Sequence, residues 1–239
     1  MKQKLDLIKF KKQLSNQNVC QVNDFFNYYS KKEPKISKAT VNWRIHDLVE
    51  KGVIQRVGRG TYEFGETTTF TQEPSEKTKE IGKIILDNYS EIKFCVWEMA
   101  FVNKLNQHLI NYNIYFVDVE RAASKYMYYD LKSIYRDVIR VQDLYEDISE
   151  FAEYIIVRPF VTDSPLMTGS EMPLPALEKI LVDLYSDKEF SPFQNNEIYH
   201  IYENAFDNYT INRNTMLRYA GRKGKRSKIS DLLTELNRQ

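Results

Sequence analysis

Three of the chain's eight glycines and two of its arginines lie within nine residues, from Gly52 to Gly60. Glycines and basic residues at this density could form a loop that holds the phosphates of a nucleotide, or a tight turn between two strands. The two possibilities differ in function, because the first suggests an enzyme and the second suggests a binding protein.

The spacing of these glycines excludes both common phosphate-binding loops. A P-loop needs four residues between its first Gly and a Gly-Lys-Ser/Thr sequence, but five residues separate Gly52 from Gly58, and Arg59-Gly60 follows. The dinucleotide-binding fingerprint fails because Glu63 stands where its third glycine is required. The stretch also follows a helical pattern, so no helix N-terminus is available to hold a phosphate. The glycines therefore indicate a hairpin.

The residues before the hairpin have the pattern of helices separated by a turn at Pro34. Val41, Ile45, Leu48 and Val49 recur at helical spacing, Ser37 is a candidate N-cap, and Gly52 is suited to a left-handed residue that ends the helix. We expect helices at 5–14, 22–29 and 38–51 and strands at 53–57 and 61–64.

This order of elements is typical of a winged helix-turn-helix, in which the second helix of the motif enters the major groove of DNA. A plain hairpin would explain the glycines but not the arginines beside them. If Val41 is buried, Ala39, Trp43 and His46 point outward, although Trp43 could instead pack against the hairpin or the first helix. The predicted DNA-binding residues are Ser37, Lys38, Thr40, Asn42, Trp43, Arg44, Arg56, Arg59 and Thr61.

The types of these residues suit different contacts with DNA. Asn42 could bind adenine through two hydrogen bonds, Thr40 a phosphate or a thymine methyl, and Arg44 a guanine or a phosphate. Lys38, Arg56 and Arg59 would contact phosphates.

The net charge of +1 conceals a basic head, an acidic middle and a basic tail. Residues 1–64 carry 13 Lys+Arg against 6 Asp+Glu, residues 65–209 carry 13 against 25, and residues 210–239 carry 8 against 2. This asymmetry points to nucleic acid at the basic ends. The tail contains a cluster between two predicted helices that is either a second nucleic-acid or partner contact or a solvated loop: Arg222, Lys223, Lys225, Arg226 and Lys228.

The predicted fold class is α+β and mostly helical, with a winged helix-turn-helix at 1–64 and a linker at 65–75. The domain at 76–239 is predicted to be mixed α/β and to end in a helical bundle. Its expected strands lie at 93–97, 113–119, near Val138 and at 153–160. Its expected helices lie at 76–88, 101–110, 121–131, 176–185, 197–208, 212–219 and 228–236.

No arrangement of residues predicts catalysis, a metal or a cofactor. The three histidines are scattered, and Glu178 and Asp183 would lie on different faces of one helix. Glu91-Ile-Lys93 has the acid-x-Lys form of some nucleases but lacks a partner. Cys20 and Cys95 suit a reducing compartment as buried apolar side chains. Without a signal sequence or an apolar run long enough to span a bilayer, the protein is expected to be cytoplasmic.

The run from Ile36 to Tyr62 (ISKATVNWRIHDLVEKGVIQRVGRGTY) resembles the N-terminal winged helix of AbiEi-like antitoxins of type IV toxin–antitoxin (abortive-infection) systems. Two further runs resemble the C-terminal helices of that family: Leu174–Leu184 (LPALEKILVDL) and Leu217–Arg226 (LRYAGRKGKR). The middle, roughly residues 90–165, matches only in its pattern of elements.

The resemblance implies a phage-defence repressor that binds inverted repeats in double-stranded DNA upstream of its own operon. It also implies that the protein counteracts a nucleotidyltransferase-like toxin, without necessarily forming a stable complex with it. Two alternatives remain open from the sequence. One is a winged-helix regulator whose C-terminal domain senses a ligand or a protein, and the other is a DNA-targeted nuclease or nucleotidyltransferase.

Overall fold

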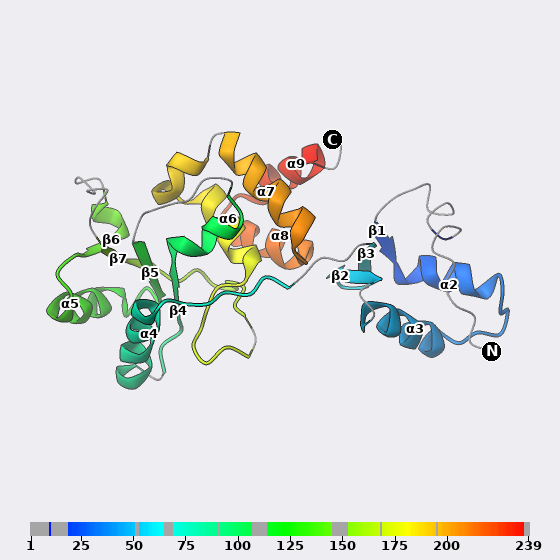
Figure 1. Ribbon diagram of the computed structural model, residues 1–239, viewed down its shortest axis with the longest axis horizontal. Coiled ribbons are helices and arrows are strands. Elements are labelled where there is room, and N and C mark those ends of the chain that lie inside the picture. The colour runs from blue at the N-terminus through cyan, green and yellow to red at the C-terminus, as the bar shows by residue number, and fades with distance from the viewer. Residues whose placement is uncertain are drawn as a thin grey trace. The chain divides into compact units, whose positions relative to one another are not determined.

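The computed structural model describes residue 10 and residues 19–50, 53–64, 69–89, 91–106, 114–144, 153–167, 169–194 and 196–236. The fold is α+β, with more residues in helices than in strands. The chain divides into two compact units (Figure 1): unit 1 comprises residues 1–69 and 208–214, and unit 2 comprises residues 70–207 and 215–239. The predicted domain boundaries at residues 64 and 76 placed residues 208–214 in the C-terminal domain, whereas they belong to unit 1.

Unit 1 consists of β1 (Val19–Gln21), α2 (Val22–Ser30), α3 (Lys38–Glu50), β2 (Ile54–Gly58) and β3 (Thr61–Phe64). Its sheet has the order β1-β3-β2, with both pairs antiparallel. The helices expected at 22–29 and 38–51 and both strands are confirmed to within one residue at each end, whereas β1 was not predicted. The helix expected at 5–14, apart from Phe10, and the role expected of Gly52 lie outside the described residues.

Local hydrogen bonds explain where the two helices of unit 1 begin. The backbone N–H of Gln21 donates to Asp24 Oδ2 at 2.7 Å, at the start of α2. The backbone N–H of Thr40 donates to Ser37 Oγ at 3.1 Å, so Ser37 caps α3 as predicted. Val41 and Ile45 are buried in the core of unit 1, which fixes the face that α3 turns toward that core.

Residues 208–214 make polar contacts with the strands of unit 1. Thr210 Oγ1 donates to Gln55 Oε1 at 2.7 Å, and Arg213 lies 3.8 Å from Glu63 in an ion pair. A Cβ at Gly58 would lie 2.5 Å from Asn214 Nδ2. The Asn214 side chain would therefore have to shift to admit a larger residue at position 58.

Unit 2 contains a four-stranded sheet of β4 (Phe94–Glu98), β5 (Ile114–Val119), β6 (Val138–Arg140) and β7 (Tyr154–Pro159). The strand order is β4-β5-β7-β6, with β4 antiparallel to β5 and the other two pairs parallel. All four strands were predicted from their apolar, β-branched sequences. Because β7 inserts between β5 and β6, the order of the strands could not be read from the order of the segments.

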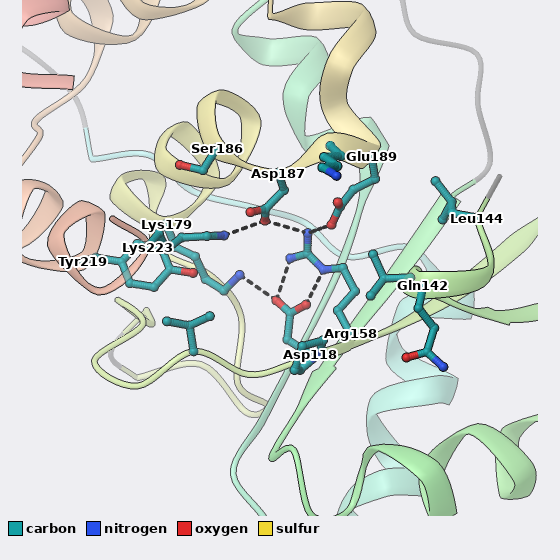
Figure 2. Close-up of a pocket in the computed structure, with 14 residues that line it drawn as sticks. Asp118, Gln142, Leu144, Arg158, Lys179, Ser186, Asp187, Glu189, Tyr219 and Lys223 are labelled. Atoms are coloured by element: carbon teal, nitrogen blue, oxygen red, sulfur yellow. Dashed lines mark hydrogen bonds and ion pairs between the residues drawn. The ribbon is translucent and has the colours of Figure 1, made fainter. Parts of the chain in front are cut away.

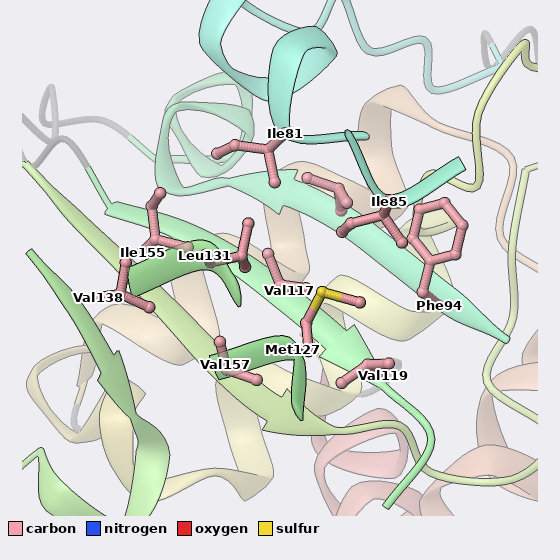
Figure 3. Packing of buried hydrophobic residues seen from close by; sticks show 11 residues of the cluster. Ile81, Ile85, Phe94, Val117, Val119, Met127, Leu131, Val138, Ile155 and Val157 are labelled. Carbon is pink, nitrogen blue, oxygen red and sulfur yellow. The ribbon is translucent and has the colours of Figure 1, made fainter. Parts of the chain in front are cut away.

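One face of this sheet carries the apolar core of unit 2 under α4 (Glu76–Asn88) and α5 (Ser124–Ile134). Val117 and Val119 of β5 point to this face because alternate residues of a strand share a face. They meet Ile81 and Ile85 of α4 and Met127 of α5 in one buried cluster (Figure 3). Helix α5 corresponds to the helix expected at 121–131, but it begins at Ser124 and continues to Ile134.

The remaining helices of unit 2 are α6 (Leu177–Ser186), α7 (Asn196–Asn208), α8 (Arg213–Arg222) and α9 (Arg226–Leu236), of which α7 and α8 reach into the 208–214 segment. All four were predicted to within about three residues at each end. In the described part of unit 2, three short 3-10 helices accompany them: η1 (Met99–Lys104), η2 (Val141–Asp143) and η3 (Lys188–Phe193). The α-helix expected at 101–110 is wrong over its first part, where η1 is found, and residues 107–110 lie outside the described part.

The other face of the sheet is partly charged. Phe116 and Asp118 of β5 alternate with the two valines that enter the apolar core, so they point to this face. Asp118 and Arg158 are partners in the parallel register of β5 and β7, which sets their side chains next to one another. Helix α6 contacts this face through ion pairs of Lys179 and Asp183.

The segment expected to be a linker, residues 65–75, is only partly described, because residues 65–68 lie outside the described ranges. Residues 70–75 belong to unit 2. Gln72 is buried and its Nε2 donates to the carbonyl oxygen of Pro175 at 2.9 Å, and Ser75 Oγ donates to Glu98 Oε2 at 2.5 Å. Polar side chains of this segment thus form hydrogen bonds within unit 2.

Both cysteines are buried and unpaired, as predicted. Burial and nearby carboxylates raise the pKa of the Cys20 thiol to about 12, and burial also raises the pKa of the Cys95 thiol. Neither thiol is therefore a ready nucleophile. Among the described residues, no helix combines the length and apolar character that crossing a membrane requires.

Candidate nucleic-acid interface and a buried ion-pair network

The outward face of α3 carries most of the predicted DNA-binding residues. Lys38, Thr40, Asn42 and Trp43 are exposed, with Trp43 at 53%. These side chains project from the helix away from buried Val41, in agreement with the helical geometry. Trp43 is therefore outside the core of unit 1, and its exposure agrees with the outward orientation.

The hydroxyl groups at the start of α3 are close together. Ser37 Oγ and Thr40 Oγ1 lie 2.9 Å apart, and Ser37 also caps the helix. They border an open hollow of about 610 Å³ that residues 33–37 and Thr40 line. Backbone N–H groups of a first helical turn favour anions, but that of Thr40 already donates to Ser37 Oγ, and Glu33 adds a negative charge to the lining.

Arg44 was predicted to contact DNA, but its guanidinium is bound by other residues of unit 1. Its two terminal nitrogens donate to the two carboxylate oxygens of Glu33, each at 3.0 Å, and the guanidinium lies 4.6 Å from the centre of the Tyr29 ring. The Arg44 side chain is only 15% exposed. A guanidinium held in this way fixes α3 against the end of α2, and we assign it a positioning role.

The β2–β3 hairpin presents the other predicted basic residues. Arg59 and Arg56 are exposed, and Arg56 Nε donates to the carbonyl oxygen of Gly58 at 3.2 Å. Gly60 has a φ of +72°, which is the reason for glycine at this end of the turn. Thr61 is half-buried at the start of β3. The hairpin therefore has a basic tip.

The predicted basic cluster near the C-terminus is divided among different environments. Arg222 ends α8 and pairs with Asp163 at 2.7 Å, and Arg226 Nη1 donates to the carbonyl oxygen of Leu217 at 3.2 Å. Lys223 is only 9% exposed and points into unit 2. Arg222, Arg226 and Lys228 are exposed and Lys225 is half-buried, so among the five only Lys223 clearly departs from the surface character that the sequence suggested.

Arg158 occupies the centre of a buried network of charged side chains in unit 2 (Figure 2). All five N–H groups of its guanidinium donate to carboxylate oxygens. They reach both oxygens of Asp118, and one oxygen each of Asp183, Asp187 and Glu189, at 2.6–3.3 Å. The guanidinium also lies 5.0–5.5 Å from the rings of three aromatic residues: Trp97, Phe116 and Phe190.

Two lysines and a tyrosine complete the network. Lys179 Nζ lies 2.6 Å from Asp118 Oδ2 and 2.5 Å from Asp183 Oδ2. Lys223 Nζ bridges Asp183 Oδ1 and Asp187 Oδ2 at 2.7 and 2.5 Å. The hydroxyl group of Tyr219 donates a hydrogen bond to Asp183 Oδ1 at 2.8 Å. Asp183 is fully buried and therefore depends on all of these donors.

The carboxylates of the network divide into two electrostatic groups. Burial alone would raise the pKa of Asp118 and Asp183. The positive charges of Arg158 and Lys179 act on both carboxylates, and that of Lys223 acts on Asp183. These charges outweigh burial, so the pKa of each carboxyl is lowered. Asp187 has the opposite balance. Burial and the neighbouring charge of Asp183 raise its pKa from 3.8 to about 6, despite Arg158 and Lys223.

A cavity of about 400 Å³ opens beside this network. Its charged wall includes Arg158, Lys179 and Asp187, and residues that directly follow β6 and β7 line it as well, Gln142 and Val161 among them. It therefore lies at the carboxyl ends of the parallel strands, where open α/β sheets bind ligands. Ser186 Oγ, also in its lining, is buried and has no hydrogen-bond partner among the described residues.

The comparison with known protein families gives a match over most of the chain. A family model described as a family of unknown function (DUF6577) matches residues 40–239. The chain belongs to this family. No curated protein matches the chain.

The DUF6577 match begins at Thr40 within α3 and includes the hairpin and the whole ion-pair network. Both C-terminal runs that resemble antitoxins contribute to this network. Lys179 and Asp183 come from the first run, and Tyr219 and Lys223 come from the second. In this DUF6577 protein the two runs thus meet in one buried site.

The sequence reasoning missed the network. It treated Asp183 only as one member of an unlikely catalytic pair and Lys223 as a surface charge. A usable signal was present, because Asp118 and Arg158 each interrupt an otherwise apolar strand, in NIYFVDV and EYIIVRPF. A charge inside such a strand needs a buried partner. Among the described residues, no group of three or more His, Cys, Asp and Glu side chains is arranged to hold a metal.

The raised pKa of Asp187 gives a prediction for Asp187→Asn. A carboxyl whose folded pKa exceeds its unfolded value favours folding at low pH, and that contribution is lost as pH rises from about 4 to about 6. Asp187→Asn should therefore raise the unfolding free energy of unit 2 near neutral pH, by about 1 kcal/mol. The gain should vanish near pH 4 in chemical denaturation. A loss of stability near neutral pH would contradict this balance of charges.

The chain offers a direct probe for unit 2. Its two tryptophans lie in different units, Trp43 in unit 1 and Trp97, fully buried, in unit 2. In a Trp43→Phe background the fluorescence of Trp97 alone would report unfolding of unit 2. This avoids treating two units as a single transition.

Proposed function

We propose that unit 1 is a winged helix-turn-helix that binds double-stranded DNA, with α3 in the major groove and the β2–β3 hairpin against the backbone or the minor groove. One observation carries the proposal: α3 buries Val41 and Ile45 and exposes Lys38 and Asn42, while a hairpin with exposed Arg59 follows the helix. A readable helix face beside a basic turn is what groove recognition requires.

The contacts would be of two kinds. Asn42 has the side chain for two hydrogen bonds to adenine, which distinguish bases. Lys38, Arg56 and Arg59 would bind phosphates, which orient the protein without reading sequence. Arg44, held by Glu33, would keep α3 at the angle that these contacts need.

We further propose that the protein represses its own operon through inverted repeats and counteracts a nucleotidyltransferase-like toxin, without being an enzyme itself. This part is supported by the resemblance of the α3–hairpin region and the two C-terminal runs to AbiEi-like antitoxins. A second candidate function, a regulator whose C-terminal unit senses a ligand, is favoured by the cavity beside the buried network.

Removal of one phosphate contact should change the salt dependence of DNA binding. For Lys38→Ala we expect the slope of log K against log salt concentration to become shallower by about one unit, because one fewer counterion is released. Fluorescence anisotropy with a labelled duplex at several salt concentrations measures this slope. Lys125→Ala removes the same charge from the exposed face of α5 and should leave the slope unchanged; equal slopes for Lys38→Ala and wild type would count against a phosphate contact.

The antitoxin part is tested by co-expression with the nucleotidyltransferase-like toxin that this proposal expects to be encoded beside the gene. We expect the full chain to restore growth of cells that express the toxin. Absence of rescue, with the chain present at normal levels and folded, would remove the antitoxin part and leave the DNA-binding part standing. Rescue by a variant that no longer binds DNA would show that the two activities are separate.

A further inference from the structure

The wall of the cavity in unit 2 belongs to a network with more carboxylates than cations. All five N–H groups of Arg158 are already used, and Lys179 and Lys223 each bind two carboxylates. Three buried or nearly buried cations thus face four acidic side chains: Asp118, Asp183, Asp187 and Glu189. The network carries one negative charge that its own members do not neutralise.

Two carboxylate oxygens in the cavity wall are left open. Asp187 uses only Oδ2 toward Arg158 and Lys223, and Glu189 uses only Oε1 toward Arg158. No described residue donates to Asp187 Oδ1 or Glu189 Oε2. The Glu189 side chain is only 7% exposed and that of Asp187 is 19% exposed, and both residues line the cavity. Two carboxylate oxygens in a cavity wall without a protein donor are a point where a donor group of a ligand could bind.

The rest of the lining suits a short apolar stem. Val141, Leu144, Pro159 and Val161 line the cavity together with the charged residues. Lys188 lies at the lining too, but it is exposed, so water screens its charge. The interior therefore offers apolar contacts and two open acceptors. Arg158 has no free donor, whereas Lys179 and Lys223 each use two of their three N–H groups on carboxylates.

We propose that this cavity binds a cationic nitrogen group, an amine or a guanidine on a short apolar stem, through Asp187 Oδ1 and Glu189 Oε2. The added cation would balance the surplus carboxylate and form hydrogen bonds to charged acceptors, which are the stronger kind. An anionic ligand at this point is disfavoured because it would face two open carboxylate oxygens, while the guanidinium of Arg158 beside them has no free N–H group. This inference does not depend on DNA binding by unit 1.

The test uses isothermal titration calorimetry of the full chain near neutral pH with agmatine, which carries a guanidine and an amine on a butyl stem. Inorganic phosphate is the anionic probe. We expect agmatine to bind and phosphate not to bind. Asp187→Asn, which should remain folded because its charge is poorly compensated, should weaken agmatine binding about tenfold or more. Asp130→Asn, an exposed residue of α5, is the matched control and should bind as wild type does.

The cationic group could belong to a small molecule or to a side chain of a protein partner, and the experiment distinguishes the two. If the natural ligand is a small molecule, agmatine should bind at least as tightly as a terminally blocked Gly-Arg-Gly peptide. If it is a side chain of a protein partner, the peptide should bind more tightly, and Asp187→Asn should weaken it as well. The proposal is overturned if neither cation binds, if phosphate binds in their place, or if folded Asp187→Asn binds the cations as wild type does.

Discussion

Replacing Arg158 with Met is expected to lower the unfolding free energy of unit 2 by about 3–5 kcal/mol, because it removes one partner from a buried charge network. Met has a comparable length and fills similar space, so the loss would come from charge and hydrogen bonds and not from a cavity. The variant would leave Asp118 without its two-point partner, and it would leave Glu189 with no donor among the described residues. Chemical denaturation followed through Trp97 measures the effect.

The pH dependence of Arg158→Met separates an electrostatic cause from a packing cause. In the wild type the pKa values of Asp118 and Asp183 are lowered, so their contribution to stability is present at neutral pH and is lost as pH falls through the folded pKa values. Without Arg158 these carboxyls would accept protons more readily. The difference in stability between wild type and variant should therefore shrink as pH falls below about 4.

Lys223→Met is the comparison for this experiment. Lys223 makes two ion pairs at the edge of the network and is 9% exposed, whereas Arg158 contacts four carboxylates. We expect a smaller loss for Lys223→Met than for Arg158→Met. Equal stability of Arg158→Met and wild type near neutral pH would contradict the structural role of the network.

The second large effect is expected in DNA recognition. Asn42→Ala should weaken binding to the operator by about 1–3 kcal/mol, the range for losing one two-point base contact. Binding to unrelated DNA should change little, because phosphate contacts supply it. Anisotropy titrations with an operator duplex and a scrambled duplex measure both quantities.

Asn27→Ala is a matched control for Asn42→Ala. Asn27 is exposed on α2, which is not the proposed recognition helix. The Asn27→Ala substitution removes the same amide group as Asn42→Ala does. We expect operator binding by Asn27→Ala to equal that of wild type. If the two variants behave alike, Asn42 does not read a base, and the proposed orientation of α3 on DNA would have to be abandoned.

The elements of unit 1 were predictable because their signals are local. Val41 and Ile45 mark one face of a helix by spacing alone, and Gly60 marks the turn of the hairpin. The ion pair of Arg44 with Glu33 was not predictable in this way. The two residues lie on either side of a turn, and only the packed structure shows that the guanidinium is already held.

The network of unit 2 was missed because no local pattern contains it. Asp118 and Arg158 become neighbours through the parallel register of β5 and β7, and nothing in the sequence fixes that β7 lies beside β5. Lys223 was grouped with adjacent basic residues, but its position four residues after Tyr219 turns it inward with that side chain. Charge runs in a sequence thus do not distinguish surface clusters from internal partners.

The most direct test of the account is a titration of the full chain with the DNA upstream of its own gene. At moderate salt we predict specific binding to that duplex, with a scrambled duplex of the same composition bound at least about a thousandfold more weakly. Equal affinity for the two duplexes, or no binding to either at low salt, would contradict the claim that α3 and the β2–β3 hairpin recognise DNA.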